Sequence, residues 1–171
     1  MKPLLVLIGY RAVGKTTIGR ELAHRLGYAF LDTDSEVQSS AGKTIADIVE
    51  QEGWPTFRRL EKEVLTRLCS LEKTVVASGG GAILHSDIWP QIKKKGHVLW
   101  LSASPEVICQ RIAYDQMHGV KRPSLLGEKE KNALDEVVAV LKERLPLYAD
   151  LADKKIHTEG RSRDDLVEEI A

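Results

Sequence analysis

The chain has 171 residues, of which 43% are hydrophobic and 29% charged, values typical of a globular protein that can bury a core. Lys plus Arg equals Asp plus Glu at 25 each, so the basic excess that general nucleic-acid binding requires is absent. The length fits one α/β domain over residues 1–171, with a modest lid, better than two domains.

The start of the chain lacks the pattern of a secretory signal. Residues 4–8 are only five apolar residues before a glycine, too few for a signal core, and no apolar run approaches the length of a membrane span. Two cysteines, Cys69 and Cys109, are too few to indicate a disulfide framework. We therefore expect a cytoplasmic monomer with small-molecule ligands and no nucleic-acid or membrane partner.

Strand and helix patterns alternate along the chain. Apolar runs bounded by turn residues predict strands at 4–8, 28–31, 74–77, 97–101 and 155–158. Amphipathic or capped segments predict helices at 16–26, from 35, at 44–53 and 54–71, from 105, at 132–151 and at 162–170. The polar stretch from about 114 to 131 is typical of a mobile loop. This alternation predicts a parallel sheet covered by helices on both faces.

The first turn carries a phosphate-binding motif. Residues 9–16, Gly-Tyr-Arg-Ala-Val-Gly-Lys-Thr, fit G-x-x-x-x-G-K-[ST] between a buried strand and an amphipathic helix. Such a loop directs backbone N–H groups and a helix N-terminus at phosphate oxygens. Lys15 would add charge at the β- and γ-phosphates, and the Thr16 hydroxyl would reach Mg²⁺. The motif predicts binding of ATP and Mg²⁺ but does not separate kinases from GTPases or mechanical ATPases.

Two carboxylates follow the second predicted strand, at the sheet edge where ligands of such folds bind. Asp32 would serve the metal, because a conventional acidic residue is missing after the strand at 74–77. Asp34 would orient an attacking hydroxyl or accept its proton, although it could instead cap the next helix. Arg58 could bind a carboxylate bidentately, or be a solvated helix charge paired with Glu61 three residues on.

Further candidates lie in turns and in the second half of the chain. The glycine run Gly79, Gly80 and Gly81 could admit a ligand closely or be only a flexible turn. Arg122 lies in the candidate lid, approximately residues 112–128, where it could close on a transferring phosphoryl group and help exclude water. Arg144 precedes Pro146 by two residues, and we expect the proline to kink the helix and aim the guanidinium inward.

With these residues in order, the sequence resembles the shikimate kinase family over essentially its whole length. The matching segments are Gly-x4-Gly-Lys-Thr-Thr-Ile-Gly-Arg (9–20), Leu-Asp-Thr-Asp (31–34), Ile-Ala-Asp-Ile-Val-Glu-Gln-Glu-Gly (45–53), Phe-Arg-Arg-Leu-Glu (57–61), Ser-Gly-Gly-Gly (78–81), Arg-Pro-Ser-Leu (122–125) and Arg-Leu-Pro-Leu-Tyr (144–148). The resemblance implies a three-layer P-loop kinase fold whose five-stranded parallel sheet has the order 2-3-1-4-5.

The resemblance also implies roles for individual positions. Catalysis would involve Lys15, Asp34 and Arg122, while Thr16 would ligate Mg²⁺ with Asp32 acting through water. The nucleotide would be bound by Ala12, Val13, Gly14, Lys15, Thr16, Thr17, Arg111, Arg122 and Arg161. Shikimate would be bound by Asp34, Arg58, Gly79, Gly80, Gly81 and Arg144. The implied reaction is transfer of the γ-phosphoryl group of ATP to the 3-hydroxyl of shikimate, in aromatic amino-acid biosynthesis.

Three departures from the family pattern leave every expected catalytic group in place. Ala12 replaces a frequent glycine, which is tolerable if φ stays negative there. Thr16 replaces a more common serine, and Ser124 interrupts the usual Arg-Pro-Leu-Leu of the lid. Two alternatives stay open: another small-molecule kinase, such as a gluconate or nucleoside monophosphate kinase, and a catalytically inactive nucleotide-binding relative.

Overall fold

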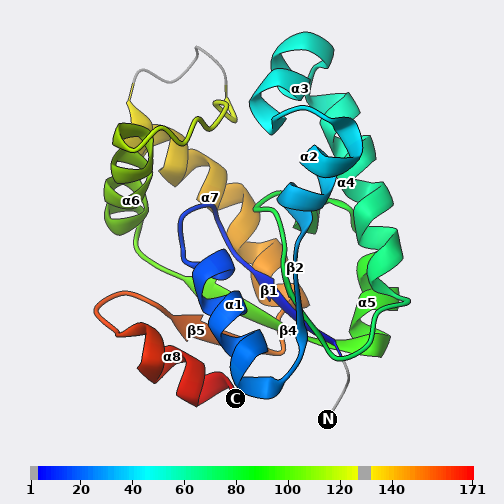
Figure 1. The fold of residues 1–171 in the computed structure, drawn as a ribbon. Helices are drawn as coiled ribbons and strands as arrows, with labels where there is room; N and C mark the ends of the chain where they lie inside the picture. Colours follow the sequence, from blue (N-terminus) through cyan, green and yellow to red (C-terminus); the bar gives the residue numbers. More distant parts are fainter. Residues whose placement is uncertain (1–3, 127–131) are drawn as a thin grey trace.

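The computed structural model describes residues 4–126 and 132–171 (Figure 1). Five parallel strands form one sheet in the order β2-β3-β1-β4-β5, as the resemblance implied. The strands are β1 Leu4–Ile8, β2 Ala29–Asp32, β3 Thr74–Ala77, β4 Gly96–Ser102 and β5 Lys154–His157. All residues of β1 and β3 are buried, which explains why their sequences are continuous apolar runs rather than alternating ones.

Helices cover both faces of this sheet. They are α1 Lys15–Leu26, α2 Thr33–Ala41, α3 Ile45–Glu52, α4 Trp54–Leu68, α5 Trp89–Lys95, α6 Pro105–Met117, α7 Ala133–Leu151 and α8 Arg163–Ile170, with a short 3-10 helix, η1, at Ala82–Leu84. In Figure 1, α1 and α8 lie together in front of the sheet, whereas α7 runs behind it. No helix in the described ranges is both long and apolar enough to cross a bilayer.

Two hydrophobic clusters hold the layers together. The larger one packs the strands against α1, α5 and α7, and includes fully buried Trp89 and Tyr148. A smaller cluster joins α2, α3 and α4 through Val37, Ile48, Phe57 and Val64. Because Phe57 is buried in that cluster, it fixes the start of α4 and therefore the position of the neighbouring Arg58.

Several predicted boundaries were wrong. Helix α5 was not predicted, since it has one short turn of apolar residues before three lysines. Helix α4 ends at Leu68 rather than Leu71. Helix α6 continues to Met117, into the stretch predicted as a loop, so the first six residues of the predicted lid are helical. The last two residues of that lid, 127 and 128, lie outside the described residues.

Candidate active site

The lysine of the phosphate-binding loop makes hydrogen bonds to the backbone at the start of the same loop. The Lys15 ammonium donates hydrogen bonds to the carbonyl oxygens of Gly9 at 2.8 Å and Tyr10 at 2.7 Å. Its side chain is buried, and that burial lowers the pKa of Lys15 to about 8, although the nearby Asp34 opposes the shift. The ammonium therefore lies at the N-terminus of α1 as a poorly hydrated positive charge beside a nest of backbone N–H groups.

The expectation that Ala12 keeps a negative φ was wrong. Ala12 has φ 63°, in the left-handed region, and its carbonyl oxygen accepts a hydrogen bond from Arg111 Nη1 at 3.3 Å. A loop that curls its N–H groups inward alternates right- and left-handed residues, and this geometry holds even where the residue is not glycine. The alanine side chain therefore strains the backbone at this position.

Ala12→Gly is expected to raise the free energy of unfolding by about 0.5–1 kcal/mol, because glycine adopts positive φ without steric cost. Urea unfolding measures this difference. The matched control is Ala113→Gly on the exposed face of α6, where the same substitution should destabilise by about 0.5–1 kcal/mol. A loss of stability in Ala12→Gly would mean that the left-handed backbone is not strained.

Two side chains beside Lys15 offer oxygen ligands that suit a magnesium ion. The Thr16 hydroxyl donates to Asp32 Oδ2 at 2.6 Å, so the end of β2 and the start of α1 meet here. The other oxygen of Asp32 accepts from the backbone N–H groups of Asp34 and Ser35, capping α2. Hydroxyl and carboxylate oxygens are hard ligands of the kind that Mg²⁺ prefers, and it commonly completes its shell with phosphates and water. The residues present therefore fit the ion.

Because Asp32 caps α2, the alternative role of Asp34 as a helix cap is wrong. Asp34 Oδ1 is buried without a hydrogen-bond partner. Burial, Asp32 and Glu61 together raise the pKa of Asp34 to about 6, while Lys15 and Arg11 partly oppose them. An unpartnered carboxylate oxygen with a raised pKa beside a cavity is a group ready to accept a hydrogen bond from a ligand hydroxyl.

The site consists of two cavities at the carboxyl edge of the sheet, of about 620 and 610 Å³. The first, which we call the donor cavity, is lined by all the predicted nucleotide residues: Ala12, Val13, Gly14, Lys15, Thr16, Thr17, Arg111, Arg122 and Arg161. The second, the acceptor cavity, is lined by all the predicted acceptor residues: Asp34, Arg58, Gly79, Gly80, Gly81 and Arg144. Four residues line both cavities: Arg11, Asp34, Gly80 and Arg122.

The glycine run lies close against charged side chains of the acceptor cavity, which leaves little room for a larger residue at two of its positions. A Cβ atom at Gly79 would lie 2.6 Å from Asp34 Oδ1 and 2.8 Å from Glu61 Oε1. A Cβ at Gly81 would overlap the Arg58 guanidinium. Arg58 Nη1 pairs with Glu61 Oε2 at 2.7 Å, but Glu61 is buried, so this is not the solvated surface pair of one alternative. Arg58 also lines the cavity, and its binding of a carboxylate stays a prediction.

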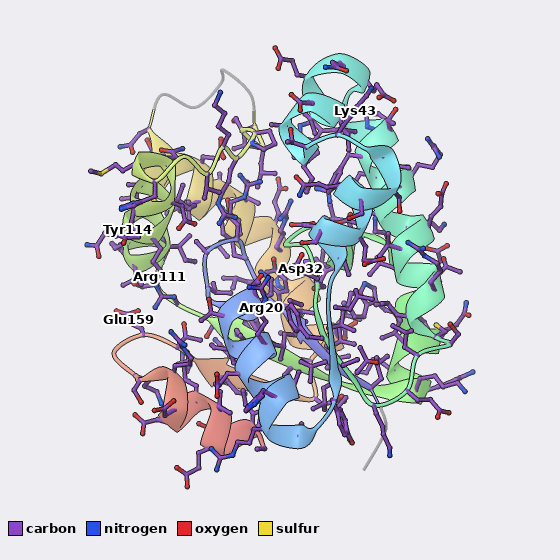
Figure 2. All side chains as sticks on the ribbon, viewed as in Figure 1. Arg20, Asp32, Lys43, Arg111, Tyr114 and Glu159 are labelled. Carbon is purple, nitrogen blue, oxygen red and sulfur yellow. The ribbon has the colours of Figure 1, made fainter. Side chains whose placement is uncertain are left out.

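The remaining arginines come from α6, the segment that follows α6, α7 and the loop before α8. Helix α7 continues through Pro146 without a break, and Arg144 is buried with its guanidinium 5.9 Å from the centre of the Tyr10 ring. Arg122 Nη2 pairs with Asp115 at 2.6 Å. Figure 2 labels Arg111 on α6 and Asp32 near the end of β2, on either side of the loop that binds phosphate in this motif.

Two site residues were not predicted. Arg11 lines both cavities, and its Nη1 donates to the Pro123 carbonyl at 2.9 Å, which joins the phosphate-binding loop to the lid segment. It occupies a variable position of the motif, so the sequence offered no signal. Glu61 is fully buried. Its spacing from Arg58 was noted, but only as a possible surface pair.

Comparisons with known proteins identify the family. A family model described as shikimate kinase matches residues 11–171. A shikimate kinase of Syntrophus aciditrophicus (strain SB) is 40% identical over 171 residues, covering 97% of this chain and 88% of that one. Another, of Symbiobacterium thermophilum, is 41% identical over 166 residues, covering 97% and 92%.

A solved structure agrees. The shikimate kinase from Acinetobacter baumannii in complex with shikimate matches with a TM-score of 0.88 and 38% identity, covering 98% of this chain and 90% of that one. This likeness confirms the predicted three-layer P-loop kinase fold, since the strand order is the one expected. With the family model spanning the chain from the phosphate-binding loop onward, these findings place the chain in the shikimate kinase family.

Proposed function

We propose that the protein transfers the γ-phosphoryl group of ATP to the 3-hydroxyl group of shikimate, a step of aromatic amino-acid biosynthesis. The observation that carries the proposal is the shared wall of the two cavities, where Asp34 and Arg122 face both donor and acceptor. The family match and the Acinetobacter baumannii relative solved with shikimate support this acceptor over gluconate.

On the donor side, Lys15 and the loop N–H groups hold the polyphosphate, and Arg111 and Arg161 border the base at the far end of the donor cavity. Thr16 and Asp32 would hold Mg²⁺, which would offset negative charge on the polyphosphate. Lys15 and Arg122 then stabilise the charge that spreads over the transferring phosphoryl oxygens.

On the acceptor side, Arg58 and Arg144 bind the acceptor carboxylate from opposite elements, α4 and α7. Asp34 accepts a hydrogen bond from the attacking hydroxyl and so directs its lone pair at the phosphorus. The segment 112–128 acts as the lid, and its Arg122 leaves Asp115 when it turns to the phosphates. Monomeric state and a cytoplasmic location are part of the same proposal.

An acceptor panel tests the function. Purified protein with ATP and Mg²⁺ is offered shikimate, gluconate and nucleoside monophosphates in a coupled assay of ADP release. We expect turnover with shikimate to exceed that with the others by about a hundredfold or more, because Arg58, Arg144 and Asp34, among other charged residues, line the acceptor cavity. If turnover with shikimate does not exceed the rate measured without shikimate, the proposal is refuted. The chain would then fit an inactive nucleotide-binding relative instead.

Two arginine substitutions separate binding from chemistry. Arg58→Ala is expected to raise the KM for shikimate about ten- to a hundredfold with a smaller effect on kcat, because Arg58 contacts a carboxylate that does not react. Arg122→Ala is expected mainly to lower kcat, by about a hundredfold, because its charge matters most in the transition state. Steady-state kinetics with each substrate varied measures both, and the reverse pattern would show that the two roles are exchanged.

The pH dependence of kcat/KM is expected to be bell-shaped. Ionised Asp34 accepts a hydrogen bond or a proton from the attacking hydroxyl better than the protonated acid does, so activity rises with pH through the Asp34 pKa of about 6. Lys15 must stay protonated, so activity in the free enzyme falls above its pKa of about 8. Because Asp34 and Lys15 interact, the two apparent pKa values of the pH profile describe the pair of groups rather than either residue alone. A profile that is flat from pH 5 to 7 would contradict the role given to Asp34.

A further inference from the structure

Glu61 is a buried carboxylate with two donors on one oxygen. Its side chain is 1% exposed, and its Oε2 atom accepts from Arg58 Nη1 at 2.7 Å and from His85 Nε2 at 2.9 Å. Its Oε1 atom is buried without a hydrogen-bond partner. A carboxylate oxygen only accepts, so the Nε2 atom of His85 carries the proton in this contact.

His85 is held in place by the short loop that follows the glycine run. It follows η1, directly after the glycine run, and its backbone N–H donates to the Ala82 carbonyl at 3.2 Å. Its side chain is 11% exposed and lines neither cavity. The same stretch of chain therefore supplies Gly81, which leaves room for the Arg58 guanidinium, and His85, which binds the partner of that guanidinium.

The contacts of Glu61 with His85 and Arg58 determine which N–H groups of the Arg58 guanidinium remain available to a ligand. A guanidinium next to an isolated buried carboxylate favours a bidentate pair that uses both carboxylate oxygens. Here Arg58 contacts only Oε2, through Nη1, and its Cζ atom lies 5.2 Å from the ring centres of both Trp54 and Phe57. With the carboxylate oriented by a second donor, the rest of the guanidinium stays directed at the cavity.

We infer that His85 is a positioning residue for acceptor binding: by fixing the Glu61 carboxylate, it keeps Arg58 to one contact with Glu61 and leaves its other N–H groups for the acceptor carboxylate. His85 touches no substrate and acts only through Glu61. This inference rests on the proposed function, because it assigns His85 a part in the affinity for an anionic acceptor.

The test compares steady-state kinetics of wild-type, His85→Ala and His85→Gln. His85→Ala is expected to raise the KM for shikimate about three- to tenfold, while kcat and the KM for ATP change less than twofold. His85→Gln, whose amide can donate from nearly the same place, is expected to restore the KM to within twofold. If His85→Ala does not fold, His85→Leu replaces it, since leucine keeps most of the volume without a donor.

A second histidine provides the matched control. His97 on β4 also faces a carboxylate, with Nδ1 3.9 Å from Asp153 Oδ2, and lines neither cavity. His97→Ala should leave all three constants within twofold of wild type. Three results would each overturn the inference. They are an unchanged KM for shikimate in His85→Ala or His85→Leu, an equal impairment of kcat and both KM values in that variant, and a KM in His85→Gln that is not restored. Wild-type protein that does not phosphorylate shikimate would instead refute the proposed function itself.

Discussion

Replacing Lys15 with alanine is expected to lower kcat by about two to three orders of magnitude and to weaken ATP binding. The ammonium is the buried positive charge of the phosphate-binding loop, and it also holds the Gly9 and Tyr10 carbonyl oxygens. The substitution therefore removes a ligand for the transferring phosphate and loosens the loop that presents the N–H groups. Coupled ADP-release kinetics and calorimetric titration with ATP measure the two effects.

The control for this substitution is Lys94→Ala on the exposed end of α5, remote from both cavities. It removes the same charge and should change kcat and ATP affinity by less than twofold. Unaltered turnover and ATP affinity in the Lys15 variant would end the assignment of the loop to ATP, whatever the acceptor.

Asp34→Asn is expected to lower kcat by about two to three orders of magnitude, because the amide cannot take a proton and replaces one acceptor oxygen with an N–H donor. The change keeps the volume of the side chain beside Gly79. The KM for ATP should change little, and the limb of the pH profile near pH 6 should disappear. The exposed Asp150→Asn on α7 is the matched control, with kinetics within twofold of wild type.

The same Asp34→Asn variant is expected to be more stable than the wild type at pH 8, by about 1–3 kcal/mol. Folded Asp34 keeps its proton up to about pH 6, whereas an unfolded aspartate releases it near 3.8. The free energy of unfolding of the wild type therefore falls as pH rises between these values, and the loss persists above pH 6. Urea unfolding at pH 8 and pH 4 measures the difference, which should be near zero at the lower pH.

Most of the fold and site could be predicted because the local patterns agree with one another. The runs at 4–8 and 74–77 are buried strands, and the motif at 9–16 lies between a strand and a helix, an arrangement that supports phosphate binding. The acceptor residues were predicted through the family resemblance that the segments carry together, since Arg58 or the glycine run alone also fits a surface charge or a turn. The structure brings these segments together around the acceptor cavity.

What could not be predicted depends on contacts between distant residues. The positive φ of Ala12 follows from the curl of the loop, whereas alanine itself favours negative φ. The burial of Glu61 follows from the approach of η1 to α4, and a helix pattern that places it three residues after Arg58 indicates only a surface pair. The role of Arg11 follows from the path of the lid segment, which nothing in residues 9–16 specifies.

We expect the four residues that line both cavities to make donor and acceptor binding interdependent. A ligand on one side alters the charge balance of Arg11, Asp34 and Arg122 that the other ligand meets. If bound nucleotide raises the affinity for the acceptor by some factor, bound acceptor must raise the affinity for nucleotide by the same factor, by thermodynamic reciprocity. An inhibitor that occupies both cavities would therefore gain affinity from the contacts in each. An inhibitor confined to one cavity would instead change in potency with the concentration of the ligand that binds in the other.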